Sequence, residues 1–127
     1  MASPDMRPRV LVVDDEPRVG EMLIKLLAPT YEAHLVLGAE RARDLIVGGA
    51  HYDAILCDLM MPEMTGMDLQ ELLERDYVEL STRTVFMTGG AFTPRAQKFV
   101  ERFVDRLLEK PFRIDDVVRA VSKILAA

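Results

Sequence analysis

The sequence Val-Leu-Val-Val-Asp-Asp-Glu-Pro, residues 10–17, contains the pattern on which the fold of this chain depends. Its four apolar residues show no polar alternation, which is typical of a short strand buried on both faces, as in a parallel sheet. Pro17 suits the first turn of a helix, and an apolar stripe at helical spacing follows it. That stripe consists of Val19, Met22, Leu23, Leu26 and Leu27. The acidic residues therefore lie where a buried strand passes into an amphipathic helix.

The same succession of a short apolar run and a helical stripe recurs along the chain. The apolar runs are Val10–Val13, Ala33–Leu37, Ala54–Cys57, Val85–Met87 and Leu107–Leu108. Strand–helix–strand units with short connections give parallel strands, right-handed crossovers and helices on both faces of the sheet. We therefore predict an α/β fold, a doubly wound five-stranded parallel sheet with five helices in a flavodoxin-like three-layer sandwich. The strand order 2-1-3-4-5 is the common one for five strands, although periodicity alone does not select it.

Length, charge and cysteine content define the class of protein. The chain has 127 residues, and we predict an N-terminal tail over residues 1–8 and one domain over residues 9–127. Its apolar runs are far shorter than the roughly 20 residues of a membrane helix. The net charge of −5, with scattered basic residues, argues against direct nucleic acid binding. Cys57 is the single cysteine and forms no internal disulfide, which favours a reducing, cytoplasmic location.

Polar side chains follow four of the predicted strands at the point where each strand ends. Asp14 and Asp15 follow the first apolar run, Asp58 the third, Thr88 the fourth and Lys110 the fifth. With the order given above these strands are neighbours, and the ligand site of an open α/β sheet lies outside the carboxyl ends of its strands. Carboxylates crowded there repel one another, and an all-oxygen site with few protein ligands suits Mg²⁺. Together with a lysine and a hydroxyl group, this arrangement predicts a phosphoryl-transfer site.

Four motifs resemble those of the receiver domains of bacterial response regulators, which accept phosphoryl groups in two-component signalling systems. The motifs are Val12–Pro17, Asp58–Gly66, Met87–Gly89 and Glu109–Phe112. The resemblance covers the chain from about Val10 to Leu125. It implies that the domain over residues 9–127 is a receiver domain, a phosphoprotein that catalyses only its own phosphorylation and dephosphorylation and is not otherwise an enzyme.

The resemblance also implies roles for the acidic residues and the lysine. Asp58 is expected to accept the phosphoryl group as an aspartyl phosphate. Asp14, Asp15, Asp58 and the backbone carbonyl of Met60 are expected to bind Mg²⁺, with Asp14 acting largely through water. Lys110 is expected to pair with Asp58 at rest and with a phosphoryl oxygen afterwards.

Further residues are implied in the response to phosphorylation. Thr88 is expected to move toward the phosphoryl group, and the loop that begins at Gly89 to follow it. The family often has an aromatic switch residue three places before the lysine, whereas this chain has Leu107 there. The Lys110–Pro111 bond resembles the cis peptide that orients the lysine in this family.

The implied partners are a cognate histidine kinase or a histidine phosphotransfer domain. A downstream protein is expected to bind the face formed by the fourth predicted helix, the fifth strand and the fifth predicted helix, with neither nucleic acid nor a membrane segment involved. The fourth helix begins at Thr93-Pro94 and the fifth contains the apolar stripe from Ile114 to Leu125. Two settings stay open: a stand-alone regulator, or a receiver excised from a hybrid histidine kinase, whose parent chain would itself be a kinase. Residues Val85–Thr93 and Glu109–Phe112 look more like receivers fused to such sensor kinases.

Three other functions are compatible with parts of the pattern. A haloacid-dehalogenase-like phosphatase also uses an aspartate nucleophile and Mg²⁺, but it needs a second acid two residues later, where this chain has Met60. A flavodoxin-like mononucleotide binder would need a glycine- and hydroxyl-rich loop after the first strand instead of Asp14-Asp15-Glu16. A docking module that works without phosphorylation would share the fold and would not use the acidic site.

Overall fold

The computed structural model describes residues 7–90 and 93–126 and contains one five-stranded sheet. The strands are β1 (Arg9–Val13), β2 (Glu32–Val36), β3 (Ala54–Asp58), β4 (Thr84–Thr88) and β5 (Leu107–Glu109). All neighbouring strands are parallel, and their order is β2-β1-β3-β4-β5. The predicted fold class and strand order are therefore confirmed. Most of the predicted N-terminal tail lies outside the described residues, as do residues 91–92 of the loop that follows Thr88.

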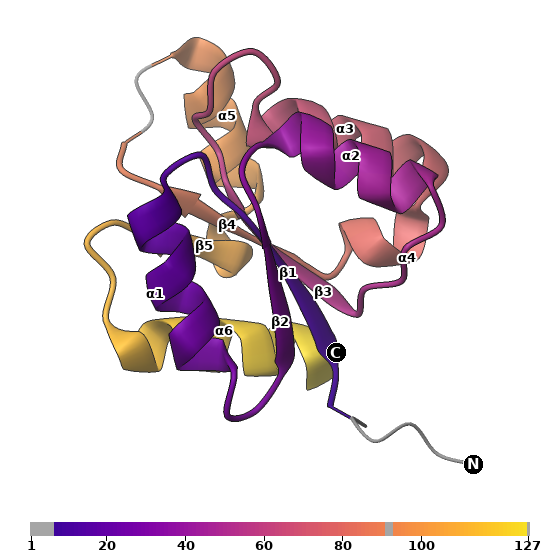
Figure 1. The fold of residues 1–127 in the computed structure, drawn as a ribbon. Coiled ribbons are helices and arrows are strands. Elements are labelled where there is room, and N and C mark those ends of the chain that lie inside the picture. Colours follow the sequence, from indigo (N-terminus) through magenta and orange to yellow (C-terminus); the bar gives the residue numbers. More distant parts are fainter. Residues whose placement is uncertain (1–6, 91–92, 127) are drawn as a thin grey trace.

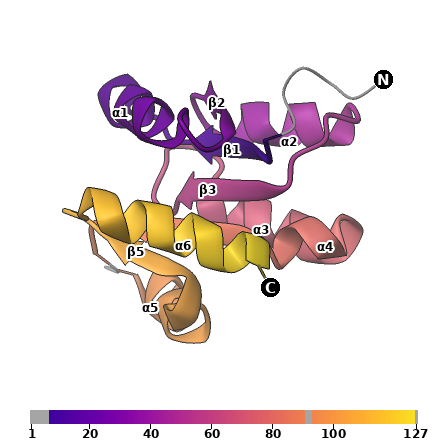
Figure 2. The ribbon, with the colours of Figure 1, turned by 90° about the horizontal axis from the view of Figure 1, so that it is seen from below.

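Helices cover both faces of the sheet and complete three layers (Figures 1 and 2). They are α1 (Pro17–Leu27), α2 (Ala39–Val47), α3 (Gly66–Asp76), α4 (Val78–Ser81), α5 (Pro94–Arg102) and α6 (Ile114–Ala126). Local sequence explains several helix ends: Pro17 and Pro94 occupy first-turn positions, and the Thr93 hydroxyl accepts the Ala96 backbone N–H at 3.0 Å as an N-cap. Within the described ranges, no helix is long and apolar enough to cross a membrane.

The described residues contain one α-helix more than the five predicted. The additional helix α4 (Val78–Ser81) has four residues, and a 3₁₀ turn over Val104–Arg106 precedes β5. A single helical turn is too short to show the 3.6-residue apolar repeat on which the prediction depended. The helices predicted as fourth and fifth are consequently α5 and α6.

The apolar core is divided by the sheet. Val10 and Val12 of β1 belong to a cluster beneath α1 and α6, whereas Leu11 and Val13 belong to a cluster beneath α2 and α3. Successive strand residues point to opposite faces, so a continuous apolar run supplies both clusters. A third, smaller cluster beneath α5 includes Phe86 of β4.

The two edge strands are less buried than the central three. Every residue of β2 is half-buried, and β5 contains one buried residue, Leu108. The expectation that every apolar run is buried on both faces is therefore wrong for these strands. An edge strand has a neighbour on one side only, so part of its surface stays accessible whatever its sequence.

Candidate functional site

The strand order brings the predicted polar residues to one edge of the sheet. Asp14 follows β1, Asp58 and Thr88 are the last residues of β3 and β4, and Lys110 follows β5. These four strands are consecutive neighbours, so their carboxyl ends form one continuous row. The Lys110 backbone N–H donates to the Thr88 carbonyl at 2.7 Å, which extends the β4–β5 pairing up to the lysine.

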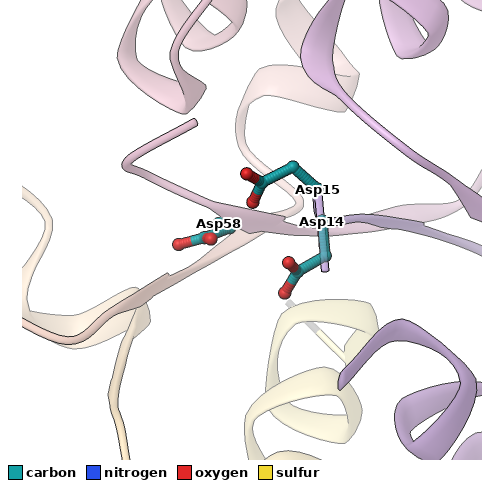
Figure 3. A group of neighbouring side chains, drawn as sticks. All are labelled: Asp14, Asp15 and Asp58. Atoms are coloured by element: carbon teal, nitrogen blue, oxygen red, sulfur yellow. The ribbon is translucent and has the colours of Figure 1, made fainter. Parts of the chain in front are cut away.

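Three carboxylates gather at the ends of β1 and β3. Asp14, Asp15 and Asp58 each offer an oxygen atom, and these atoms lie within 4.8 Å of one another (Figure 3). Asp14 and Asp58 are buried, whereas Asp15 is exposed to solvent. The site thus has two water-excluded acids and one acid at its mouth.

Asp14 is only partly satisfied by protein groups. Its Oδ1 accepts the Glu16 backbone N–H at 2.9 Å, while its Oδ2 accepts no hydrogen bond from the described residues and lies 3.7 Å from Lys110 Nζ. Burial raises the pKa of the Asp14 carboxyl, and the nearby Lys110 opposes that effect. A buried oxygen without a donor, next to two further carboxylates, fits a hard divalent cation.

Asp58 has a similar environment and a direct partner. Its carboxylate lies 3.4 Å from Lys110 Nζ. Burial raises the pKa of Asp58 to about 6; Lys110 lowers it, and the charge of Asp14 raises it further. Above that pH the carboxylate is mostly ionised and carries a lone pair at a sheltered position beside a fixed positive charge.

The backbone directly after Asp58 is held by hydrogen bonds of Leu59. Leu59 N–H donates to the Met87 carbonyl of β4 at 2.9 Å, and Gly66 N–H donates to the Leu59 carbonyl at 2.9 Å. A Cβ atom at Gly66 would lie 2.3 Å from the Asp58 carbonyl oxygen, so only glycine allows α3 to begin this close to the strand. Cys57 is fully buried behind Asp58, and burial raises the pKa of its thiol.

Thr88 is turned toward its own loop. Its hydroxyl donates to the Gly90 carbonyl at 2.9 Å and accepts the Gly90 N–H at 3.0 Å. A cavity of about 190 Å³ lies beside it, lined by Gly89, Gly90, Val100, Glu109 and Lys110. The hydroxyl is therefore engaged locally, with free space next to it.

The remaining predicted residues surround this core of the site. The Met60 side chain is exposed, and its backbone lowers the pKa of the nearby Asp58 carboxyl. The Lys110–Pro111 peptide bond is cis. Leu107 pairs with Phe86 across β4 and β5 and packs against the cluster beneath α5, so it lies behind the sheet end rather than in the acidic site.

Sequence reasoning did not single out the start of α3. Thr65 Oγ1 accepts the Asp68 N–H at 3.1 Å, and Asp68 Oδ2 accepts the Thr65 N–H at 2.9 Å, which is a reciprocal capping box. The signal was available as Thr65-Gly66-Met67-Asp68, a Thr followed three residues later by an acid. This cap, together with Gly66, fixes where α3 meets the end of β3.

Comparison with known proteins identifies the family. The family model described as "Response regulator receiver domain" matches residues 10–122. The chain belongs to the receiver domain family of response regulators. Receiver domains of two-component systems bind Mg²⁺ at a cluster of aspartates, and this receiver domain has such a cluster at the ends of β1 and β3.

Relatives and solved structures agree with this assignment. The receiver domain is 34% identical over 121 residues to the transcriptional regulatory protein TcrA of Mycobacterium tuberculosis, covering 91% of this chain and 46% of that protein. It is 28% identical over 123 residues to the two-component response regulator ORR3 of Oryza sativa, covering 96% and 94%. The structure of the Francisella response regulator 1452 receiver domain shares the fold with a TM-score of 0.78 and 24% identity, covering 94% of this chain and 98% of that one. The chain spans about half the length of the first curated relatives that it matches.

Proposed function

We propose that Asp58 is the phosphorylated residue of this receiver domain and takes its phosphoryl group from a phosphohistidine. The observation that carries the proposal is the position of its carboxylate, sheltered at the end of β3 and 3.4 Å from Lys110 Nζ. The donor is the phosphohistidine of a cognate histidine kinase or of a histidine phosphotransfer domain. A histidine kinase partner follows from membership of the family; the identity of the donor residue and of the acceptor belong to the proposal.

The chemistry assigned to Asp58 is an in-line displacement at phosphorus. A carboxylate oxygen forms the new P–O bond, the P–N bond to the donor imidazole breaks, and that nitrogen leaves with the electron pair. Lys110 moves from the carboxylate to a phosphoryl oxygen, where its charge offsets the negative charge that develops. Water later attacks the phosphorus of the acyl phosphate, the P–O bond to Asp58 breaks, and inorganic phosphate leaves as the carboxylate is regenerated. The domain therefore cycles by its own phosphorylation and dephosphorylation and has no further substrate.

The metal ligands in this proposal are Asp14, Asp15, Asp58 and the carbonyl of Met60. Support comes from the unpaired Oδ2 of Asp14 and from the close approach of the three carboxylates. When bound, Mg²⁺ would neutralise charge on the phosphoryl oxygens and relieve the repulsion among these acids. Asp14 would act largely through water, a role taken from the resemblance to the family.

The switch in this proposal begins at Thr88. Phosphorylation adds a charge of roughly −1.5 to −2 and strong acceptor oxygens. The Thr88 hydroxyl then leaves Gly90 and donates to a phosphoryl oxygen, and the loop that begins at Gly89 follows it. Leu107 cannot act as an aromatic switch, so the signal passes to a downstream protein through the face of α5, β5 and α6 by other contacts. Direct nucleic acid binding is not part of the proposal.

The proposal also places this receiver domain in the cytoplasm and attaches it to a sensor kinase. A cytoplasmic location agrees with the free, buried thiol of Cys57. Attachment to a sensor histidine kinase, which the sequence favours slightly over a stand-alone regulator, stays a prediction. Reading the coding sequence on both sides of these 127 residues tests it.

The experiment is incubation with acetyl phosphate and Mg²⁺, read as a gain of one phosphoryl group by intact mass. Wild type should gain the group, Asp58→Asn should not, and omission of Mg²⁺ should suppress the gain. Asp44→Asn removes an exposed carboxylate on α2 and should behave as wild type. Equal labelling of Asp58→Asn would overturn the assignment of the acceptor. Absence of labelling in wild type would favour the docking module that works without phosphorylation.

A further inference from the structure

Helix α5 is held on the sheet differently from the other long helices. Ala96 is its single buried residue, whereas α1 and α6 each bury three. Its larger apolar residues, Phe99 and Val100, are half-buried. Apolar burial therefore fixes α5 less firmly than it fixes α1 or α6.

An aromatic contact joins α5 to the strand that carries Thr88. The Phe86 ring lies 4.8 Å from that of Phe99 and 5.0 Å from that of Phe103, measured between ring centroids. Phe86 precedes Thr88 by two residues on β4, and residues 89–93 join Thr88 to the first residue of α5. Thr88 is therefore linked to α5 in two ways, by sequence connection and through these rings.

Besides its aromatic contact with β4, α5 is joined to α3 by ion pairs. Arg95 Nη1 lies 2.9 Å from Asp68 Oδ1, and Arg95 Nη2 lies 2.9 Å from Glu71 Oε1. Arg102 makes a bidentate pair with Glu74, at 2.6 Å and 3.2 Å. The three acids follow one another at intervals of three residues along α3, and the two arginines are separated by two turns of α5. We call these five residues the α3–α5 clasp; Figure 1 shows the two helices on the same side of the sheet.

We propose that the α3–α5 clasp holds α5 in its resting position, so that a phosphoryl group on Asp58 must compete with it. The inference rests on the proposed function, because it concerns how phosphorylation of Asp58 is felt at α5. It adds a regulatory contact on the face opposite α1 and α6, made of charged groups that are accessible to solvent.

The expected size follows from the exposure of these groups. An interaction made only in the resting state lowers the apparent affinity for any ligand of the active state, and its removal raises that affinity. The clasp side chains are between 29% and 68% exposed, so each pair alone contributes little. Three pairs in one arrangement, one of them bidentate, should together change the affinity by about threefold to tenfold.

The experiment is a titration with beryllofluoride in saturating Mg²⁺, followed by amide NMR shifts, on wild type and Arg95→Gln/Arg102→Gln. The variant should bind about threefold to tenfold more tightly than wild type. Arg43→Gln/Arg75→Gln is the charge-matched control, because it also removes two positive charges, and these arginines pair with their sequence neighbours Asp44 and Asp76 outside the clasp. It should bind as wild type does.

A charge-reversal cycle separates the ion pair from other effects of Arg102, whose guanidinium also lies 4.5 Å from the centre of the Phe103 ring. Arg102→Glu should tighten binding, and Glu74→Arg/Arg102→Glu should bring the affinity back toward that of wild type. Asp68 is left intact throughout, because it also caps α3.

The outcomes distinguish the two proposals. If wild type does not bind beryllofluoride at all, the proposed function fails. If wild type binds but the clasp variants bind equally tightly or more weakly, the clasp proposal is overturned and phosphorylation at Asp58 still stands. If Arg43→Gln/Arg75→Gln tightens binding as much as Arg95→Gln/Arg102→Gln, the effect comes from net charge, and the clasp proposal is likewise overturned.

Discussion

The apolar cluster beneath α1 and α6 and the carboxylates of Asp14 and Asp58 are both buried, with opposite consequences for stability. Burial of apolar side chains such as Leu23 stabilises the fold by roughly 25 cal/mol for each Å² removed from water. Burial of Asp14 and Asp58 disfavours their charged forms and raises the pKa of both carboxyls. The apolar cluster stabilises the folded protein. The buried carboxylates lower its stability, and a ligand that binds them offsets that loss.

The largest expected effect comes from the apolar region. Leu23→Ala removes a fully buried side chain beneath α1 and should lower the free energy of unfolding by about 2–5 kcal/mol. Urea unfolding measures the loss. Met22→Ala is the matched control, because Met22 is the adjacent residue and is 47% exposed; it should change stability by about 0.5 kcal/mol or less. A loss in Leu23→Ala no larger than in Met22→Ala would remove the contrast between the two regions.

An opposite effect is expected at the acidic group. Asp58 has its pKa raised from 3.8 to about 6 in the folded protein, so the folded state binds more protons than the unfolded state between those values. Its charge therefore costs stability above pH 6, and Asp58→Asn should stabilise the metal-free protein by on the order of 2 kcal/mol at pH 7.5.

The pH dependence sharpens that prediction. The gain from Asp58→Asn should shrink as the pH falls through 6 and should be nearly absent at about pH 4, where wild-type Asp58 is protonated in the folded protein. Urea unfolding of both proteins at several pH values in the presence of a chelator measures it. Loss of stability in Asp58→Asn at pH 7.5 would mean that its pairing with Lys110 outweighs its burial.

A smaller effect is expected from the cation itself. Mg²⁺ at ten times its dissociation constant should raise the free energy of unfolding by about 1.4 kcal/mol. Thermal melting with MgCl₂, compared with NaCl at equal ionic strength, measures the shift. Asp15→Asn keeps the buried acids and removes the exposed one, so it should reduce the shift. Equal melting temperatures in the two salts would argue against a Mg²⁺ site here.

Much of this contrast could be predicted from sequence, because each region follows from a local pattern. The apolar run Val10–Val13 indicated a buried central strand, and the acids directly after it had to lie at the strand's carboxyl end. The parallel order then brought Asp58 and Lys110 together, although they are 52 residues apart. The sequence therefore predicted which residues meet in the site wherever those residues lie at the carboxyl ends of strands.

The features that escaped prediction depend on which helix faces lie opposite one another. Arg95 was one of the scattered basic residues of the sequence, and no sequence period shows that Arg95 and Arg102 have partners on α3. The turn α4 was too short to give a periodic signal, and the half-burial of β2 follows from its edge position rather than from its composition. These properties depend on how the elements are placed in the tertiary structure, and local sequence propensity carries no information on that placement.

The thiol behind Asp58 gives this protein an internal reporter. Cys57 is the only cysteine in the sequence, is completely buried, and donates to the Asp58 carbonyl at 3.3 Å. A thiol in this state reacts with an alkylating reagent only when β3 becomes accessible. The rate at which Cys57 is alkylated in the unmodified chain therefore measures how often β3 opens near Asp58, and no engineered probe is needed.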